Sequence, residues 1–326
     1  MPKRKNIVVI GGGTGTSVVL EGLKKYNVNL SAIITTADDG SSSGELRKEY
    51  GMIPPGDVRQ CLVALASRDF GYLNDRFRQG SLTGHTLGNL LITLFFQKNK
   101  DFQQAIDELL RVTGAQGSLI PMTLKPTTLI AKLQGGRILR GEKNITPSRE
   151  ISTKLSSLYL APKNIPANPR GIDAIENADM IVVGPGNLYS SIMPNLLVGG
   201  IKKALVSSGA KKIYISNLFT QPGHTDNFTI YDFVKAISKY TGKDIFTHII
   251  YNNRPIPQEI FKKYKNSIIS SQVQIPASIK KDKRFLGRSI AKLSPRLAAP
   301  SDPIAKIRNP FLHDSKKLAK AIMELV

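Results

Sequence analysis

Short apolar runs alternate with longer amphipathic stretches through most of the chain. Near the start, residues 6–10 have the pattern of a buried strand, residues 11–15 of a glycine turn, residues 16–26 of a helix and residues 30–36 of a second strand. This order predicts a parallel βαβ unit, because a helical crossover returns the chain to the sheet in the same direction.

The middle of the chain changes pattern. Helical periodicity predicts helices at about 57–67, 70–79, 84–97 and 101–113, of which the last two make a mostly α insertion. Gly135 and Gly136 then separate two alternating apolar runs, which is typical of a β-hairpin. Together with residues 154–160, the hairpin predicts a small, partly antiparallel β region.

After residue 170 the α/β order returns. The expected elements are a helix ending at 173–178, a strand at 180–183, a helix near 196–208, a strand at 212–216, a helix near 229–241 and a strand at 246–251. Residues 285–310 are rich in Pro, Arg and Lys and weakly periodic, so we expect a surface segment there, before a last helix at about 314–325.

These elements predict an α/β fold: a Rossmann-like, doubly wound, mostly parallel sheet with a helical insertion and a small β-hairpin region. We expect a single nucleotide-binding domain over residues 1–280, with insertions at about 57–160. A basic C-terminal segment, residues 281–326, follows it and ends in a helix.

Composition narrows the cellular setting. The 326 residues are 41 % hydrophobic and 21 % charged, which is ordinary for a globular protein, and the single cysteine, Cys61, allows no disulfide framework. We see no targeting segment, and the apolar run at 90–96 is too short to span a bilayer. We therefore expect a cytoplasmic protein with no membrane span.

The formal net charge of +22 raises the hypothesis of an anionic partner. Clusters such as KKDKR at 280–284 would suit nucleic acid or an anionic surface, but we find no helix-turn-helix, zinc knuckle or aromatic RNA-binding motif, and no Trp. We favour a field that attracts anionic metabolites and do not expect a nucleic-acid partner.

The first candidate site is the glycine turn that follows the first strand. Its residues are Gly11, Gly12, Gly13, Thr14 and Gly15. Bare backbone N–H groups beside the positive end of a helix bind phosphate. The turn lacks the GK[ST] of a P-loop and only partly fits the dinucleotide fingerprint. A phosphate site is therefore our prediction; dinucleotide binding and a purely structural tight turn are the alternatives.

Two adjacent acids follow the second strand, at the same edge of the sheet. Asp38 and Asp39 precede Gly40, Ser41 and Ser42. Carboxylates beside a phosphate site repel the ligand unless a cation lies between them, and oxygen-rich sites of this kind suit Mg²⁺. The segment therefore predicts a possible Mg²⁺ cofactor at a phosphate site.

Three further charged residues have a functional and a structural explanation. Asp57, after a Pro-Pro-Gly turn, is a third candidate for the metal and is equally suited to cap the next helix. Arg47 and Arg59 could pair with phosphate, or form ion pairs with nearby acids.

Other polar loops also follow predicted strands or begin helices. The candidate ligand-binding residues in them are Gly88, Asn89, Gly184, Gly186, Asn187, Tyr189 and Asn217. His85, next to the first of these, could serve as a ligand or proton carrier, although a lone histidine at a helix start is more often a cap. Loops at the carboxyl ends of parallel strands converge, so together they predict one nucleotide-like site.

Six motifs carry a family resemblance. They are IGGGTG (10–15), DDGSSSGELR (38–47), PPGDVRQCL (54–62), GHTLGNLL (84–91), ADMIVVGPGNLYSSIMPNLLVGGI (178–201) and NLFTQPGHTD (217–226). In this order the chain resembles the YvcK-like gluconeogenesis factors, which belong to the superfamily of the phospholactate transferase CofD. The resemblance covers about residues 6 to 250.

The resemblance implies binding of a nucleotide sugar of the UDP-N-acetylglucosamine type, with regulation of carbon flow to cell-wall precursors and of cell shape. The alternative it implies is a Mg²⁺-dependent transferase of the 2-phospho-L-lactate type, acting on a nucleotide diphosphate. In that case Asp38 and Asp39 match the catalytic acids, and Asp39 and Asp57 the metal ligands. A metabolic-enzyme partner and a homodimer remain open, and no tightly held organic cofactor is expected.

The sequence departs from the family pattern at two positions. Ser41 stands where the family commonly has Gly, which carries a modest cost if the backbone there has positive φ. His224 stands where the family often has Glu, so any role of a carboxylate at that position is in doubt.

Overall fold

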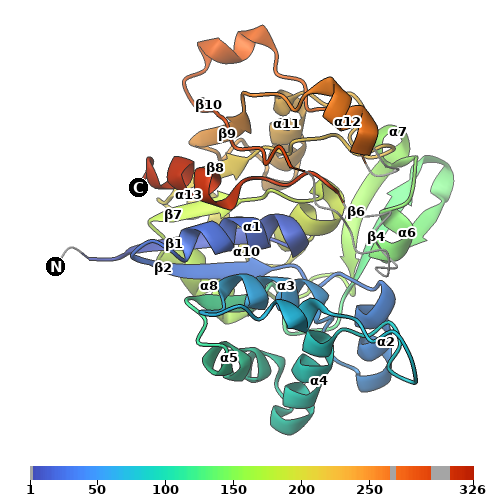
Figure 1. Ribbon diagram of the computed structural model, residues 1–326. Helices are drawn as coiled ribbons and strands as arrows, with labels where there is room; N and C mark the ends of the chain where they lie inside the picture. The colour runs from blue at the N-terminus through green and yellow to red at the C-terminus, as the bar shows by residue number, and fades with distance from the viewer. Residues whose placement is uncertain (1–2, 265–268, 295–308) are drawn as a thin grey trace.

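The protein is built around a parallel sheet of seven strands in the order β10-β9-β8-β7-β1-β2-β3 (Figure 1). The computed structural model describes residues 3–264, 269–294 and 309–326. The strands are β1 (Lys5–Gly11), β2 (Val28–Ile34), β3 (Ser118–Pro121), β7 (Met180–Val183), β8 (Lys211–Ile215), β9 (His248–Asn252) and β10 (Phe285–Arg288). Every pairing between neighbours in this sheet is parallel, as the sequence predicts.

Helices cover both faces of the sheet, so an inner strand such as β1 is buried on both sides. In β1, Val8 and Ile10 pack into one apolar core, and Ile7 and Val9 into the other. Such double burial explains why the strand is a continuous apolar run rather than an alternating one.

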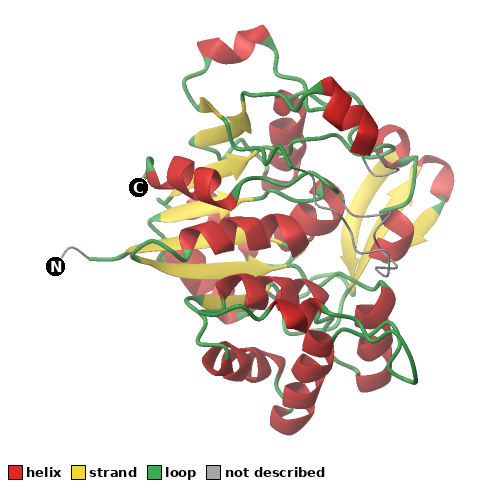
Figure 2. Cartoon of the chain, in the orientation of Figure 1, coloured by secondary structure: helices red, strands yellow, loops and turns green. Residues whose placement is uncertain are grey.

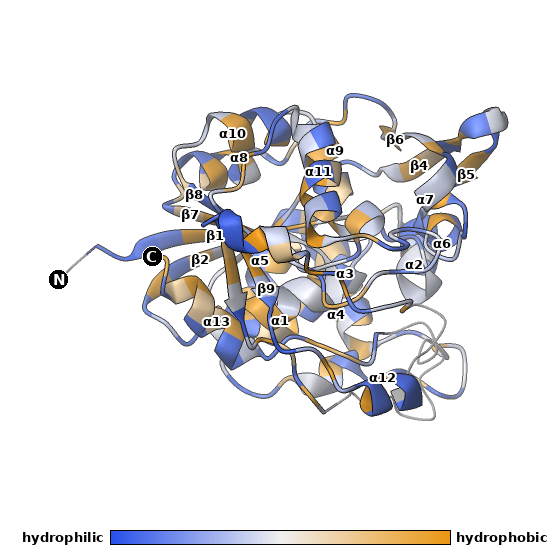
Figure 3. Cartoon of the chain, turned by 90° about the horizontal axis from the view of Figure 1, so that it is seen from above, coloured by the Kyte–Doolittle hydropathy of each residue, from blue (hydrophilic) through white to orange (hydrophobic). Residues whose placement is uncertain are grey.

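One face carries α1 (Gly13–Leu23), α3 (Gly56–Leu65), α4 (Leu87–Asn99), α5 (Phe102–Val112) and α13 (Ser315–Met323). The other carries α8 (Pro169–Glu176), α9 (Met193–Leu197), α10 (Ile201–Ser207) and α11 (Ile230–Thr241). The helices are amphipathic: in α13, Leu318 and Ile322 are buried while Lys317 and Lys320 are exposed, a division visible in the hydropathy colouring of Figure 3.

A second, three-stranded antiparallel sheet stands beyond the carboxyl ends of the parallel strands (Figure 2). Its strands are β4 (Thr128–Leu133), β5 (Ile138–Arg140) and β6 (Leu155–Ala161), and the short helices α6 (Glu142–Ile145) and α7 (Ile151–Lys154) follow β5. Gly135 and Gly136, both with positive φ, turn the chain between β4 and β5, so the predicted hairpin is confirmed.

Several predicted elements need correction. The segment after β2, in which no helix was predicted, contains α2 (Ser41–Tyr50), whose Leu46 is buried. The helix expected at 70–79 is only a 3-10 turn, η1 (Gly71–Asn74). The single helix expected near 196–208 is two, because Gly199 and Gly200 interrupt it and Gly200 has a φ of 99°. The strand β3 was not predicted.

The C-terminal quarter also differs from the prediction. The surface segment expected at 285–310 is wrong for Phe285–Arg288, which pair with β9 as an edge strand of the main sheet. The last helix, α13, packs against α1 so closely that a Cβ on Gly22 would lie 2.1 Å from the carbonyl oxygen of Ser315. Residues 295–308, part of the same expected segment, lie outside the described residues.

No helix among the described residues is long and apolar enough to cross a membrane.

Candidate functional site

Glycine lets four loops meet at the carboxyl edge of the sheet. A Cβ on Gly12 would lie 2.3 Å from Cγ2 of Thr35 and 2.5 Å from Oδ2 of Asp57. A Cβ on Gly15 would lie 2.1 Å from the carbonyl oxygen of Pro185, where both partners are backbone. The first glycine turn is therefore wedged between the loops that follow β2 and β7, and only glycine fits at these contacts.

These loops enclose a cavity of about 650 Å³. The predicted site residues in its walls are Gly12, Gly13, Thr14, Gly15, Asp38, Gly40, Ser41, Ser42, Asp57, Asn89, Gly186, Asn187 and Asn217. They come from six segments spread over more than 200 residues. Four of these segments are the loops after β1, β2, β7 and β8, which are expected to meet because they follow neighbouring parallel strands. The geometry thus brings together most of the residues that the sequence singles out.

Six of the predicted residues do not line the cavity. They are Gly11, Asp39, Arg47, Gly88, Gly184 and Tyr189. Gly11 and Gly88 make room for neighbouring side chains, those of Thr16 and Arg59 respectively. The Arg47 guanidinium donates to the hydroxyl of Thr128, 3.1 Å away, and so ties α2 to the small sheet rather than pointing into the cavity.

The loops that follow β7 and β8 are joined to each other. Gly184 has a φ of 77° and precedes a cis peptide bond to Pro185, which sets the direction of the loop after β7. The Asn217 amide donates to the carbonyl of Gly186 over 2.8 Å. Tyr189 is buried behind this loop, and its ring centroid lies 6.0 Å from that of His224. Gly184 and Tyr189 therefore shape the wall from outside the cavity.

Three half-buried carboxyl groups line the cavity and repel one another. Burial, and after it the neighbouring Asp38, raise the pKa of Asp57 to about 8 against the opposing effect of Arg59. Burial also raises the pKa of Asp38, although the Gly40 N–H and the Ser43 hydroxyl favour its charged form. The pKa of Glu142 is raised well above its ordinary value by burial and by these two aspartates.

Asp39 points away from its neighbour. Its carboxylate accepts a hydrogen bond of 2.9 Å from the backbone N–H of Lys143, and a Cβ on Gly141 would collide with it. The predicted pair of acids is therefore split: Asp38 faces the cavity, and Asp39 holds the start of α6. As predicted metal ligand or catalytic residue, Asp39 is less well placed than Asp38.

The acid set can be tested against the expected Mg²⁺. Among the described residues, no three His, Cys, Asp or Glu side chains form a group that could hold a metal ion unaided. Magnesium, however, commonly takes one or two carboxylates and completes its shell with water and substrate phosphate. Asp38 and Asp57, whose mutual repulsion a cation would relieve, fit that mode.

Four cationic side chains share the cavity with the acids: Arg59, Arg76, Lys143 and Arg149. Arg59 is buried; it donates to the amide oxygen of Asn89 over 2.9 Å and also bonds Asn74. Arg76 donates to the carbonyl of Gly84 over 2.6 Å. Of the four, the sequence had suggested only Arg59 for a ligand site. Together with the N-terminus of α1, they can neutralise phosphate groups.

Part of the cavity wall is apolar. Leu218, Phe219, Ile269, Phe311 and Leu312 line it there, and all but Leu312 belong to one apolar cluster. Phe219 stacks on Phe261, with ring centroids 5.4 Å apart, and the ring centroid of Phe311 lies 5.0 Å from that of Phe219. The sequence gives no signal for this cluster, because its residues come from segments almost a hundred residues apart with no shared pattern. The cavity can thus take a ligand with an anionic part and a flat, apolar part.

A buried polar atom in a residue of the cavity wall lacks a hydrogen-bond partner. The amide oxygen of Asn187 is inaccessible and accepts no hydrogen bond. An unsatisfied buried acceptor costs free energy unless a ligand or water supplies a donor. Asn187 is therefore well placed to bind a ligand.

Two of the other histidines, His224 and His313, are structural in their contacts. His224 Nε2 lies 3.0 Å from the carbonyl oxygen of Ile145, and His313 Nε2 lies 3.2 Å from that of Ser216. Burial lowers the pKa of each to about 4, so both are neutral at pH 7. His224, which replaces the Glu common in the family, thus brings no charge to the site.

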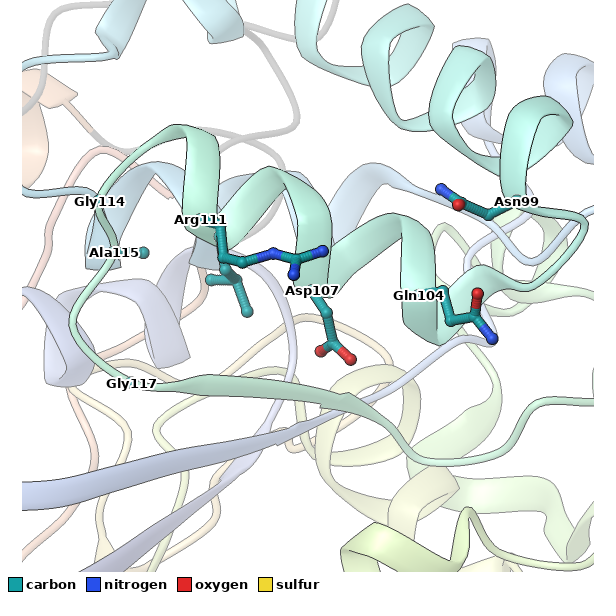
Figure 4. Close-up of a pocket in the computed structure, with 8 residues that line it drawn as sticks. Asn99, Gln104, Asp107, Arg111, Gly114, Ala115 and Gly117 are labelled. Carbon is teal, nitrogen blue, oxygen red and sulfur yellow. The ribbon is translucent and has the colours of Figure 1, made fainter.

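A second depression, of about 580 Å³, lies beside α5 (Figure 4). Asn99, Gln104, Asp107, Leu110, Arg111, Gly114, Ala115 and Gly117 line it. It contains none of the predicted site residues, and Asp107 is already paired with Arg170 at 2.7 Å. We therefore place the functional site in the first cavity.

Comparisons with known proteins agree with the fold and the motifs. The model of the family "2-phospho-L-lactate transferase CofD" matches residues 7–290. The chain is 37 % identical over 326 residues to the gluconeogenesis factor of Halalkalibacterium halodurans, covering 99 % of this chain and 97 % of the relative. It is also 37 % identical to the gluconeogenesis factor of Bacillus subtilis, over 100 % of this chain and 99 % of the relative.

A solved structure gives the same result. The crystal structure of a UPF0052 family protein from Bacillus halodurans is 36 % identical and superposes with a TM-score of 0.86, over 99 % of this chain and 100 % of that one. The resemblance seen in the sequence is confirmed: the chain belongs to the 2-phospho-L-lactate transferase CofD family and, within it, to the gluconeogenesis factors.

Proposed function

We propose that the cavity binds a nucleotide sugar of the UDP-N-acetylglucosamine type and that the protein thereby regulates carbon flow to cell-wall precursors and cell shape. The observation that carries this proposal is the polarity of the cavity. Its wall combines a helix N-terminus, four cations and several carboxylates with a cluster of aromatic and aliphatic side chains. A diphosphate suits the charged groups and a flat base the apolar cluster.

The experiment is a thermal-shift series with UDP-N-acetylglucosamine, other nucleotide sugars and dinucleotides, each with and without Mg²⁺. A ligand that binds only the folded state raises the melting temperature by mass action; at 100 times Kd the stabilisation is about 2.7 kcal/mol. We expect UDP-N-acetylglucosamine to give a larger shift than a dinucleotide. No shift at millimolar concentration would contradict the proposal.

The matched variants are Arg149→Met and Arg111→Met. Arg149 lines the cavity, and Arg111 lines the separate depression beside α5. Each change removes one guanidinium and keeps most of the side chain's length. We expect Arg149→Met to lower affinity for the nucleotide sugar by roughly 10-fold or more, the usual scale for a charge-assisted contact, and Arg111→Met to leave it unchanged. Equal effects would point to long-range charge rather than a contact.

The second candidate function is a transferase that acts on a nucleotide diphosphate with Mg²⁺. The specific observation in its favour is the pair Asp38 and Asp57, two carboxyl groups with raised pKa beside the phosphate-binding turn. Bound Mg²⁺ would polarise a phosphoryl oxygen, and the glycine turn and cations would orient the phosphates. Asp57→Asn should abolish any turnover with Mg²⁺ while the protein remains folded; turnover that survives would exclude this role.

A further inference from the structure

A chain of four polar contacts runs from the interior to the surface beside the cavity. Arg59 Nε lies 2.9 Å from Asn89 Oδ1, and Asn89 Nδ2 lies 3.0 Å from Ser42 Oγ. Ser42 Oγ lies 2.9 Å from His85 Nδ1, and His85 Nε2 lies 3.4 Å from a carboxylate oxygen of Glu45. Of these five residues, Ser42, Asn89 and Arg59 line the cavity.

The chemistry of the first member fixes the direction of the first two contacts. A guanidinium can only donate, so the atom of Asn89 that faces Arg59 is its oxygen. The Asn89 NH₂ group must then face Ser42 and donate to its oxygen. The Ser42 hydrogen can be donated to His85 Nδ1 in the tautomer of His85 that carries its proton on Nε2, facing Glu45.

We propose that Ser42 is a nucleophile, with His85 as its general base and Glu45 as the residue that orients and stabilises the imidazolium. The arrangement has the roles of a serine–histidine–acid triad, with a hydroxyl on one ring nitrogen and a carboxylate on the other. The family's known acids do not include these residues, and the proposal does not depend on which nucleotide binds.

The position of Ser42 supports this role. It stands in the first turn of α2, after the N-cap Gly40, where the helix dipole stabilises negative charge. The residue is buried, with 3 % of its surface exposed, and that surface faces the cavity. His85 is close to buried at 13 % side-chain exposure, whereas Glu45 is at the surface with 66 %. The base is shielded, and its proton has a path to solvent.

The step that this geometry supports is attack on a phosphoryl group in the cavity, a substrate class that rests on the proposed function. Ser42 Oγ bonds to phosphorus as its proton passes to His85 Nδ1. The phosphorus–oxygen bond to the leaving group breaks, and the leaving oxygen takes the electron pair and then the proton from His85. Water can reverse the sequence and release phosphate from Ser42, with His85 again as base.

A probe that needs no knowledge of the substrate tests the nucleophile. Diisopropyl fluorophosphate reacts with activated serines: Oγ bonds to phosphorus and fluoride leaves. We expect labelling at Ser42, located by peptide mass spectrometry, in the full chain. Failure to label Ser42 would overturn the proposal without affecting the thermal-shift result for nucleotide sugars.

The variant His85→Asn separates activation of the Ser42 hydroxyl by a base from the structural role of the hydrogen bond that Ser42 makes with residue 85. The asparagine oxygen can accept the Ser42 hydrogen in place of Nδ1 but cannot take the proton. We expect labelling to fall at least 100-fold, the scale of general-base catalysis. His248→Asn, a histidine exchanged on β9 outside the cavity, is the matched control and should label as the parent does. Equal labelling in His85→Asn and the parent would overturn the role of His85.

A thiol at the same position gives a second readout. In Ser42→Cys, a nearby base should promote thiolate formation, so alkylation by iodoacetamide should reach half its maximal rate at lower pH than in Ser42→Cys with His85→Asn. Glu45, which contacts this histidine, and Arg76, which donates to the carbonyl of the preceding Gly84, are unchanged in the pair. The native Cys61 is buried and gives little background. Coincident pH profiles would overturn the proposal.

Discussion

The carboxylate of Asp39 and the backbone N–H of Lys143 are joined by a hydrogen bond of 2.9 Å. The bond connects the acidic loop after β2 to the first turn of α6, the helix that follows β5 of the small antiparallel sheet. It fixes one wall of the cavity to another, since Glu142 and Lys143 both line it.

This contact predicts a measurable coupling between Asp39 and Gly141. Gly141 has φ 82° and ψ 154°, and a Cβ there would lie 1.8 Å from an Asp39 oxygen. Gly141→Ala should destabilise the protein both by backbone strain and by this clash. Asp39→Ala alone should cost about 1–2 kcal/mol. In a double-mutant cycle measured by urea unfolding, Gly141→Ala should cost less in the Asp39→Ala background; strictly additive effects would contradict the contact.

The three acids predict an unusual pH dependence. An unfolded aspartate loses its proton near pH 4, whereas folded Asp57 keeps its proton to about pH 8. Between these values the folded state binds more protons than the unfolded state, so stability falls as pH rises, by up to about 1.4 kcal/mol per pH unit for each such group. Asp57→Asn should reduce this slope between pH 5 and 8, and Mg²⁺ should raise the melting temperature of the parent more at pH 8 than at pH 5.

The buried histidines predict the opposite slope at lower pH. Unfolded histidine gains a proton near pH 6.5, but folded His224 does so only at about pH 4. Between these values the unfolded state binds more protons, and stability is lost as pH falls from about 6.5 to 4, again by up to about 1.4 kcal/mol per pH unit. His224→Gln can keep a donor near the carbonyl of Ile145 and should reduce the loss of stability between pH 6.5 and 4. The free energy of unfolding, measured with urea at several pH values, tests this.

Ser41 predicts a stabilising substitution. Its φ is 42°, which costs an L-residue free energy that glycine avoids. Ser41→Gly should therefore stabilise the fold by up to ~1 kcal/mol. Lys100→Gly is the control, because it relieves the same kind of backbone strain away from the cavity. Lys100 has a φ of 55° at the C-cap of α4. A loss of stability in Ser41→Gly with a gain in Lys100→Gly would mean that the Ser41 side chain makes compensating contacts.

The fold was predictable where local pattern and sheet geometry agree. The apolar runs of β1, β2, β7 and β8 identify buried parallel strands, and the order of elements implies that the loops after them meet. The position of Gly12, Asp38 and Asn217 around one cavity follows from that rule. The strand β10 was missed because its four residues, FLGR, stand next to basic and Pro-rich sequence and are an edge strand.

The rest of the site depends on tertiary contacts that leave no local signal. The helix α2 begins with three serines and a glycine, residues that favour turns, and packing of Leu46 outweighs that preference. Glu142, Lys143 and Arg149 reach the cavity only because the small sheet folds back over it. Phe219 and Phe311 form part of the apolar region of the cavity wall, although no sequence spacing relates the two segments that they come from. Whether the predicted residues bind the ligand stays a prediction that the thermal-shift variants test.

The place of β1 in the sheet has a consequence for how the chain is made. Its partner on one side, β2, leaves the ribosome soon after it, but the partner on the other side, β7, begins only at Met180. At about 5–20 residues per second, the second edge of β1 waits roughly 10–30 s for its partner. During that interval an apolar strand with free backbone N–H and carbonyl groups is open to wrong pairings. Slow translation between β2 and β7 would lengthen this vulnerable period, so a binder of nascent chains should act on this protein before residue 180 is made.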